Sequence, residues 1–425
     1  AELEARYCAV RSAAERAGRH VAILVDLAGA KLRLGNVAPD TTLEAGEAFT
    51  LVREERAGDA SAATISYAGL ASDVSTGDRI LLDDGRIELR VTGSDGDAVV
   101  TEVVVGGPLS SHKGVNLPAA TLGIDPITAF DREVLEWTAE AGADLIAQSF
   151  VRRAADVLAL REMMGAATIP IVAKIEKHEA AENLAEIIDV ADMVMVARGD
   201  LGVEMSVEAV PAMQRRIVRE SRAAGRPVIV ATEMLDSMRD RPHPTRAEAS
   251  DVATAIFQRA DAIMLSAETA VGKYPVESLT TMARIAERSE ADLVGTGRQP
   301  STGGRWDVAA AVSAAVVDLG EDLDLAAIVT TTESGATARA VAHYRPETPI
   351  VAITPHADIA RRLAVVWGVE PVVVPKSETT STMLERAAAA ALESGLARPG
   401  QLIAVTGGRA TGVTGGTDFV QVLPV

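Results

Sequence analysis

Between residues 20 and 270 the chain alternates short runs of β-branched and other apolar residues with longer amphipathic stretches. The amphipathic stretches predict helices, such as Asp131 to Ala141, Glu179 to Ile188, and Val207 to Ala224 with Gly225 as its end. Repeated strand–helix units at this spacing predict an α/β barrel or a doubly wound sheet. The apolar runs end in polar or charged residues and predict buried parallel strands over 21–27, 145–150, 171–176, 193–199, 228–233 and 262–268.

Two stretches depart from this rhythm. Residues 36–118 are rich in Thr, Val, Gly and Asp, with turn signals at Asp84-Gly85 and Asp95-Gly96, and predict a small β-barrel inserted as a movable lid. A fresh alternation after Trp306 predicts a second α/β domain, with strands near 326–331, 350–354, 371–374, 402–406 and 419–423. We therefore expect a barrel domain over 1–35 and 119–290, a lid over 36–118, a linker over 295–304 and a C-terminal domain over 300–425.

The barrel interpretation leaves a shortfall. A (β/α)8-type barrel needs eight strands, and the pattern supplies six. The chain opens on a predicted helix from Leu3 to Ala17, without an initiator methionine. We expect a leading segment of about 40 to 60 residues, two strand–helix units, to be absent from this chain. An open α/β sheet is the alternative, and we rank it lower.

The charge and the cysteine content limit the partners and the cellular location that we expect. The 41 basic and 60 acidic residues give a net charge of -19, which disfavours nucleic acid and anionic membranes as partners. The single cysteine, Cys8, makes no intrachain disulfide, and no stretch reaches the roughly 18 apolar residues of a membrane helix. We expect a soluble, cytoplasmic protein. Because only six residues are lysines, a lysine within a motif is notable.

Charged side chains gather at two consecutive strand ends. Lys174 and Glu176 stand at the end of one predicted strand, and Asp200 follows the next. Neighbouring strands lie about 4.8 Å apart, so Glu176 and Asp200 are placed to hold one ion between them. Magnesium, or manganese, suits two carboxylates with water and substrate phosphate in the other positions. Lys174 points to the same face as Glu176, because side chains alternate along a strand.

Gly199 lets backbone amides approach a ligand at a helix start, where an anion is favoured. A plainer alternative is that Lys174 and Glu176 form an ion pair and Asp200 caps a helix. Charged groups at several consecutive strand ends favour the site, since a buried charge costs several kcal/mol unless it is paired or used. The signals at the other strand ends, including Thr232, are individually weak because Thr and Ser often cap helices.

In the second domain, hydroxyls and a glycine lie between a predicted strand and a helix start, at Thr332, Ser334, Gly335 and Thr337. Such a loop can cradle phosphate. An ordinary helix cap explains it equally well. The stretch from Gly407 to Gly416 is either a cover for the same ligand or a plain loop.

The succession of motifs resembles the pyruvate kinase family over essentially the whole chain. The resembling strings are V-N-L-P from Val115, A-K-I-E from Ala173, M-V-A-R-G-D-L-G from Met195, P-T-R-A-E from Pro244, I-M-L-S-A-E-T-A from Ile263 and H-Y-R-P from His343. The resemblance implies phosphoryl transfer from phosphoenolpyruvate to ADP, giving pyruvate and ATP in glycolysis. It also implies a homotetramer and a phosphorylated effector bound at the 332–337 loop.

Residue by residue, the resemblance implies that Glu176 and Asp200 bind the metal. It implies that Lys174 neutralises charge in the transition state. The amides of Gly199 and Asp200 would meet the substrate carboxylate, and Thr232 would bind it and relay a proton. The resemblance also implies that Arg33 and Lys113 bind the nucleotide.

One departure from the family pattern concerns potassium. Members that need potassium carry Glu where this chain has Lys31, whereas members independent of it carry Lys. A tethered ammonium supplies the monovalent charge near the substrate. We therefore predict that potassium is not required. The alternative, ranked second, is that Lys31 only extends into solvent.

Other departures bear on activity. The family's Arg-Leu-Asn-Phe-Ser-His segment, whose arginine binds substrate phosphate, does not occur in this sequence, and Glu233 and Ala267 replace Gln and Gly. We expect the complete gene product to be active and this chain alone to be weak. Two alternatives remain: a catalytically impaired paralogue, and a metal-dependent lyase that stabilises a pyruvate enolate without phosphoryl transfer.

Overall fold

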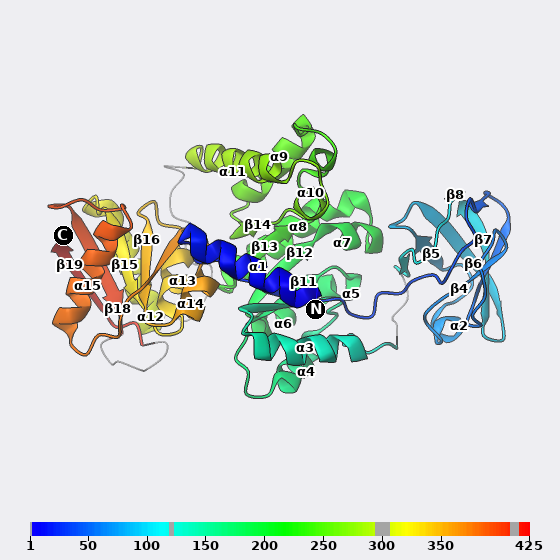
Figure 1. Cartoon of the computed structure of the whole chain (residues 1–425), viewed down its shortest axis with the longest axis horizontal. Helices are drawn as coiled ribbons and strands as arrows, with labels where there is room; N and C mark the ends of the chain where they lie inside the picture. The colour runs from blue at the N-terminus through cyan, green and yellow to red at the C-terminus, as the bar shows by residue number, and fades with distance from the viewer. Residues whose placement is uncertain (1, 119–122, 294–306, 409–415) are drawn as a thin grey trace.

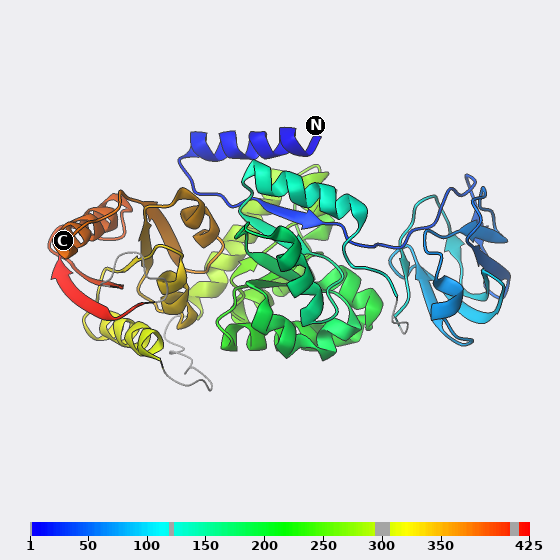
Figure 2. The same cartoon turned by 90° about the horizontal axis from the view of Figure 1, so that it is seen from below.

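A computed structural model describes residues 2–118, 123–293, 307–408 and 416–425. The chain forms three bodies in a row (Figures 1 and 2). A sheet flanked by helices occupies the middle, a β-rich body lies at one end, and the C-terminal α/β body lies at the other. The linker predicted over 295–304, and most of the glycine-rich stretch after Gly408, lie outside the described residues.

The central body contains a six-stranded, all-parallel sheet in the order β1-β10-β11-β12-β13-β14. This confirms the six strands expected from the apolar runs. Five of them end earlier than predicted, because the chain turns into a helix or loop where its polar residues begin. The strands are β1 (Leu24–Leu27), β10 (Leu145–Gln148), β11 (Ile171–Ile175), β12 (Met193–Ala197), β13 (Val228–Ala231) and β14 (Ala262–Ile263).

Helices connect these strands and cover the outer face of the sheet. Two of them begin with capping boxes, in which Thr128 pairs with Asp131 and Thr245 pairs with Glu248. The helices are α1 (Glu2–Ala17), α3 (Ala129–Ala141), α4 (Ala154–Met164), α5 (His178–Glu182), α6 (Leu184–Val190), α7 (Arg198–Glu204), α8 (Val210–Ala223), α9 (Arg246–Phe257), α10 (Ala267–Ala270) and α11 (Pro275–Ala291), with 3-10 turns η1 (Val207–Ala209) and η2 (Asp236–Arg239).

Two helix predictions need correction. The segment expected as one helix from Glu179 to Ile188 is split at Asn183, whose side-chain amide donates to the carbonyl of Arg152 at 3.0 Å. The segment from Val207 begins as a 3-10 turn, and α8 starts only with Pro211 in its first turn. Gly225 has φ +69°, as a helix-ending glycine requires.

The core of the central body lies between the sheet and its helices. Residues such as Ile146, Ile171, Val194 and Val230 are fully buried there against the helices. Their neighbours in each strand point to the opposite face and form a second buried cluster, which includes Val172 and Met195. Burial on both faces explains the continuous apolar runs in the sequence.

The β-rich body follows β1 and is built mainly from one six-stranded sheet in the order β4-β3-β7-β6-β5-β9. Its hairpin between β5 and β6 turns through Asp83, Asp84 and Gly85, all with positive φ, and the next turns through Gly96. It also contains one short helix, α2 (Leu70–Asp73), which the all-β prediction missed. The strands are β2 (Thr42–Leu43), β3 (Ala48–Val52), β4 (Ala62–Thr64), β5 (Arg79–Leu82), β6 (Ile87–Asp95), β7 (Ala98–Val105), β8 (Gly107–Pro108) and β9 (Val115–Asn116).

The C-terminal body has a five-stranded sheet in the order β17-β16-β15-β18-β19, in which the last strand runs antiparallel. All five predicted strands are present within a few residues. Its elements are α12 (Val308–Asp322), β15 (Ala327–Thr331), α13 (Ala336–His343), β16 (Ile350–Thr354), α14 (Ala357–Leu363), β17 (Val369–Val373), α15 (Thr380–Glu393), β18 (Leu402–Gly407) and β19 (Phe419–Pro424).

A buried carboxylate of the central body binds both helix α1 and the C-terminal body. Asp144, fully buried just before β10, accepts hydrogen bonds from Arg11 of α1 at 2.6 Å and from Arg361 of α14 at 2.7 Å. Helix α1 also packs beside α3, where Tyr7 meets Trp137 edge to face (Figure 2). None of the described helices has the length and apolar character needed to cross a bilayer.

Candidate active site

The carboxyl ends of β1, β10 and β11 bring an acid, a hydroxyl and an amine together. The ammonium of Lys174 lies 3.2 Å from a carboxylate oxygen of Asp26, 2.8 Å from the hydroxyl of Ser149 and 3.6 Å from Glu176. Burial alone would lower the pKa of Lys174, but the charges of Glu176 and Asp26 outweigh it and raise the pKa above its ordinary value. Lys174 is therefore a fixed, charged ammonium.

Glu176 is a buried carboxylate that is only partly satisfied. One of its oxygens accepts the backbone N–H of Phe150 at 2.7 Å. The other has no hydrogen-bond partner, although Glu176 is only 1 % exposed. Burial, only partly offset by Lys174 and increased by the charge of Asp200, raises the pKa of Glu176 to about 7. This oxygen has only the longer, 3.6 Å ion pair with Lys174, and a buried carboxylate oxygen without a hydrogen bond is costly unless another group binds it.

Asp200 lies in the first turn of α7, directly after β12. Its carboxylate pairs with the ammonium of Lys31 at 3.1 Å, although the two residues are 169 positions apart. The side chain makes no helix-capping hydrogen bond at α7. The plain capping alternative for Asp200 is therefore wrong, whereas the ion pair of Lys174 with Glu176 exists alongside the site.

These donors fit a magnesium or manganese ion. No cluster of three or more acidic, His or Cys side chains suited to a metal occurs among the described residues. Magnesium, however, commonly uses one or two carboxylates and takes its other ligands from water and substrate phosphate. The unpartnered oxygen of Glu176 and the neighbouring charge of Asp200 match that requirement.

Thr232 and Gly199 meet beside the site. The N–H of Gly199 donates to the Thr232 hydroxyl at 2.8 Å, and that hydroxyl donates to the Ala231 carbonyl at 2.7 Å. Thr232 has φ +68° and Glu233 has φ +54°, a strained pair for non-glycine residues. Strain of this kind persists only where surrounding contacts fix the chain, and it clusters at functional sites.

Arg198, which was not predicted as a site residue, supplies those contacts. Its buried guanidinium donates to the carbonyl of Ala231 at 3.2 Å and to the carbonyl of Thr232, and it pairs with Asp251 at 2.6 Å. The guanidinium therefore fixes the end of β13 in its left-handed conformation. Its place in the A-R-G-D-L-G string, directly before Gly199 and Asp200, could have indicated that it lies at the site.

Arg33 and Lys113 lie on the adjacent backbone segments by which the chain enters and leaves the β-rich body, joined by a bridge between Arg33 and Gly114. Their side chains diverge. The guanidinium of Arg33 donates to the His112 carbonyl at 3.0 Å, whereas Lys113 pairs with Asp83 at 2.8 Å. The structure thus brings the two candidate nucleotide-binding residues together through their backbones, with Arg33 exposed to solvent.

A buried polar contact joins the lid to the central body. Glu204, at the end of α7, accepts Lys177 at 2.7 Å and the side-chain amide of Asn116 from β9 at 3.1 Å. All three are at least nine-tenths buried. Since α7 also carries Asp200, this contact connects the lid to the candidate metal ligand. The V-N-L-P motif, which contains Asn116, does not by itself predict this contact.

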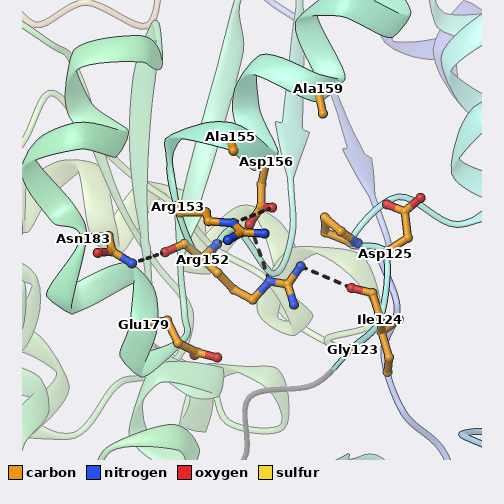
Figure 3. Close-up of a pocket in the computed structure, with 11 residues that line it drawn as sticks. Gly123, Ile124, Asp125, Arg152, Arg153, Ala155, Asp156, Ala159, Glu179 and Asn183 are labelled. Atoms are coloured by element: carbon orange, nitrogen blue, oxygen red, sulfur yellow. Dashed lines mark hydrogen bonds and ion pairs between the residues drawn. The ribbon is translucent and has the colours of Figure 1, made fainter. Parts of the chain in front are cut away.

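Two cavities lie next to this junction. A cavity of about 630 Å³ is bounded by residues 123–126, the start of α4 and α5. Figure 3 shows Arg152 reaching across it to the carbonyl of Ile124, at 3.2 Å. It shares Ile124, Arg152 and Glu179 with a cavity of about 40 Å³, which is also lined by Lys31, Asn116 and Lys177. Solvent-sized space therefore extends from the lid junction along the outside of the central body.

Three residues that touch the site directly were not predicted from the sequence. Asp26 and Ser149 hold Lys174, and the amide of Phe150 holds Glu176. Phe150 has φ +56°, a further strained residue at this edge. The sequence pattern could have indicated all three as site residues, because each stands at or near a predicted strand end.

Glu233 and Ala267, the two departures from the family pattern, make no contact within the described part of the chain that disturbs the site. Glu233 is exposed, so its charge is solvated and not buried beside Thr232. Ala267 begins the short helix α10, and the following Glu268 is buried and accepts the N–H of Leu235 at 3.0 Å and of Ser266 at 2.8 Å. Neither residue is drawn into the cluster around Lys174.

In the C-terminal body the four hydroxyl-loop residues come together at the start of α13. The N–H of Gly335, which has φ +80°, donates to the Thr332 hydroxyl at 2.8 Å. The Thr337 hydroxyl lies 2.8 Å from that of Thr417. The bond to Thr332 holds the loop internally, whereas no side-chain capping hydrogen bond is made at Gly335, the N-cap residue of α13.

Two models of one protein family match the chain, one over its N-terminal part and one over its C-terminal part. Residues 2–279 match the family model described as pyruvate kinase, barrel domain, and residues 310–423 match the model described as pyruvate kinase, alpha/beta domain.

Three relatives carry corresponding names. The chain is 43% identical to pyruvate kinase 2 of Synechocystis sp. over 97% of its own length and 71% of the relative's. It is 44% identical to a pyruvate kinase of Geobacillus stearothermophilus, over 98% and 72% of the two lengths. For a pyruvate kinase of Clostridium acetobutylicum the identity is 40%, over 99% and 91%.

Proposed function

The chain belongs to the pyruvate kinase family, and from that premise we propose that its chemistry takes place where Lys174, Glu176 and Asp200 meet. The family's reaction carries the phosphoryl group of phosphoenolpyruvate to ADP and yields pyruvate and ATP. The observation that carries the proposal is the buried, half-satisfied carboxylate of Glu176, held between an ammonium and a second carboxylate. The lyase alternative has no support, because both family domains match the chain.

Glu176 and Asp200 would hold the divalent cation, magnesium or manganese. When bound, that ion would neutralise phosphate charge and orient the substrate oxygens. The preformed ion pairs, Glu176 with Lys174 and Asp200 with Lys31, hold both carboxylates in place before substrate arrives. The unpartnered oxygen of Glu176 is the natural first ligand, because binding the cation removes its desolvation cost.

Lys174 would stabilise the transferring phosphoryl group and the enolate oxygen that its departure leaves. Its ammonium is preorganised by Asp26, Ser149 and Glu176, so little reorganisation is needed as negative charge develops. Its raised pKa keeps it protonated throughout, so it acts as a fixed charge and not as the proton donor.

Thr232 and the amides of Gly199 and Asp200 would bind the substrate carboxylate. The Gly199 N–H now donates to the Thr232 hydroxyl, so an incoming carboxylate oxygen would replace that acceptor and free the hydroxyl to donate to substrate. A hydroxyl in this place can then pass a proton toward the enolate carbon. Arg198 acts only through Thr232, by holding its carbonyl.

The nucleotide would be bound from the lid side, by Arg33 and Lys113. Lys113 is paired with Asp83 and would exchange that partner for nucleotide phosphate. The Asn116–Glu204–Lys177 contact gives the lid a fixed point against α7, so lid closure and Asp200 are mechanically linked. Closure would exclude water from the phosphoryl group.

Three further features belong to the same proposal. Lys31 would replace a monovalent cation beside Asp200, and the 332–337 loop, with Thr332, Ser334, Gly335 and Thr337, would bind a phosphorylated effector. The protein would act as a cytoplasmic homotetramer, as the resemblance to the family implies.

A coupled assay of ATP formation from phosphoenolpyruvate, ADP and Mg²⁺ tests the function. Manganese binding, followed by electron paramagnetic resonance, tests the site independently of turnover. We expect wild type to bind Mn²⁺ and Glu176→Gln to lose most of that binding. Mn²⁺ binding that survives unchanged in both Glu176→Gln and Asp200→Asn would contradict the assignment. Mn²⁺ binding without turnover would instead indicate the catalytically impaired paralogue.

A further inference from the structure

Cations crowd the junction between the central body and the C-terminal body. Five cationic or potentially cationic side chains line one small cavity there, and Asp261 is the one carboxylate among its lining residues, all of which belong to the described part of the chain. The cationic set is contributed by both bodies: Arg222 and Arg226 from the end of α8, and Arg339, His343 and Arg345 from α13 and the turn after it.

Arg345 is the most deeply buried member of this set. Its side chain is only 4 % exposed, and one terminal nitrogen serves both Asp261 and the carbonyl of Arg259, each at 2.9 Å. Its Nε and its other terminal nitrogen have no hydrogen-bond partner. A guanidinium presents five N–H donors, and buried donors without acceptors are costly. The protein therefore leaves an acceptor position beside Arg345 unfilled.

The charges around this position do not balance within the protein. Asp261 already accepts the backbone N–H of Val228 at 3.0 Å as well as Arg345. Burial, together with the charges of Arg345 and Arg259, lowers the pKa of Arg222 to about 10. Burial and the charges of Arg222 and Arg345 also lower the pKa of His343. The charged forms of Arg222 and His343 are thus destabilised by neighbouring cations, and an anion among them would relieve the repulsion.

We propose that this junction cavity binds a small tetrahedral oxyanion, phosphate or sulfate in size, either free or as the terminal group of a larger molecule. The cavity measures about 20 Å³. Because about 10 to 15 Å³ is needed for one water, this enclosed space admits one or two oxygen atoms of such a group, and the rest of the group would lie at the open mouth of the cavity. Charge-assisted bonds from arginine, which presents planar pairs of donors, suit a phosphoryl group better than a halide.

Occupancy of this site would have two structural consequences. The anion would contact Arg226 of the central body and Arg345 of the C-terminal body, and would therefore hold the two together. Arg339, which lines the cavity, also donates to the carbonyl of Ser334 at 3.2 Å. The anion site is thus one side chain away from the 332–337 loop, while remaining separate from it.

Trp367 provides a local reporter for the site. Its ring lies under the Arg345 guanidinium, 4.7 Å from centroid to carbon, and its N–H donates to Glu290 at 2.6 Å. The chain has three tryptophans, so Trp137→Phe with Trp306→Phe leaves Trp367 as the single indole emitter. In this background the full chain is titrated with sodium phosphate, sodium sulfate, methyl phosphate and sodium chloride at constant ionic strength.

We expect a saturable change in Trp367 emission with phosphate and sulfate, and none with chloride. Arg345→Gln should abolish the change, and Arg226→Gln, which spares the Asp261 ion pair, should weaken binding at least about tenfold. Arg398→Gln, an exposed arginine elsewhere in the same body, is the matched control and should bind as the parent does. Methyl phosphate binding like phosphate would assign the site to terminal phosphoryl groups, and its exclusion would assign it to the free anion.

Two outcomes would overturn the proposal. The first is the lack of any saturable emission change with phosphate or sulfate. The second is an emission change that persists with full affinity in Arg226→Gln, since the anion would then be acting from another part of the chain. Circular dichroism of each variant establishes whether Arg345→Gln keeps its fold, and Arg226→Gln decides the question if it does not.

Discussion

The ammonium of Lys31 lies 3.1 Å from a carboxylate oxygen of Asp200, across the boundary between the lid connection and the central body. Lys31 is held between the backbone strands that enter and leave the lid, and Gly114 lies against its side chain. A fixed cation therefore stands beside the candidate metal ligand whether or not potassium is present.

Replacing that cation should create a need for a free one. We expect wild type to turn over equally well in potassium-free and potassium-containing buffer. Lys31→Glu should lose about tenfold or more of its activity without potassium and regain part of it when potassium is added, because the new carboxylate can bind the ion. Coupled assays in tetramethylammonium buffer measure this. Lys273→Glu, an exposed charge reversal, serves as control, and strong potassium stimulation of wild type would contradict the assignment.

Glu176→Gln should separate metal binding from stability. The amide keeps the hydrogen bond from Phe150 and removes a carboxylate whose pKa burial raises to about 7. We therefore expect the melting temperature without metal to stay the same or rise, while Mn²⁺ affinity falls at least about tenfold. Paired thermal unfolding and Mn²⁺ titrations check both. A large loss of stability would show that Glu176 is chiefly a structural ion-pair partner.

The hydroxyl of Thr232 should matter more than its methyl group. Thr232→Ser keeps the bond with the Gly199 N–H and should retain most activity, whereas Thr232→Ala should lower kcat/KM by about 10²-fold. Steady-state kinetics with phosphoenolpyruvate measure the difference. Equal activity of the two variants would remove Thr232 from the reaction.

Breaking the buried pair between Lys177 and Glu204 should be costly, whereas removing it as a unit should be mild. Glu204→Leu alone leaves a buried ammonium without its carboxylate and should cost about 3 to 5 kcal/mol. The double variant Lys177→Met with Glu204→Leu should recover most of that loss, yet still lack the lid contact to Asn116. Urea unfolding measures the stability, and a raised KM for ADP in the double variant would report the loosened lid. Recovery of both quantities would show that the contact does not position the lid.

The capping box of α9 should give a pH-dependent contribution to stability. Burial alone would raise the pKa of Glu248, but hydrogen bonds from Ser237 and Thr245 outweigh it and lower the pKa. A carboxyl whose pKa is lower folded than unfolded stabilises fully above its unfolded value of about 4.3, and this contribution is lost as pH falls through the folded value.

Wild type should therefore exceed Glu248→Gln in stability at neutral pH, with the difference shrinking below about pH 4.3. Thr245→Ala should cost about 1 kcal/mol. Denaturant unfolding across a pH series measures these effects, with exposed Glu393→Gln as the charge-matched control. A difference that stays constant down to pH 2 would contradict the account.

The sequence determined the local features of this protein. Continuous apolar runs identified the six parallel strands, Asp-Gly pairs identified the lid hairpins, and two-residue alternation placed Lys174 and Glu176 on one face. These properties depend on residues within a few positions of one another, and the strand and turn periods carry them directly. Helix breaks such as the one at Asn183 were missed because a contact with Arg152, in a different strand–helix unit, decided them.

Only the tertiary structure decided which distant residues form ion pairs and hydrogen bonds with one another. Lys31 with Asp200, Asp26 with Lys174, Asn116 with Glu204, and the cations gathered at Arg345 are all pairings over long stretches of chain. Periodicity gives no register between such segments. Their proximity follows from packing, and burial then decides which charges find partners and which donors and acceptors are left for a ligand.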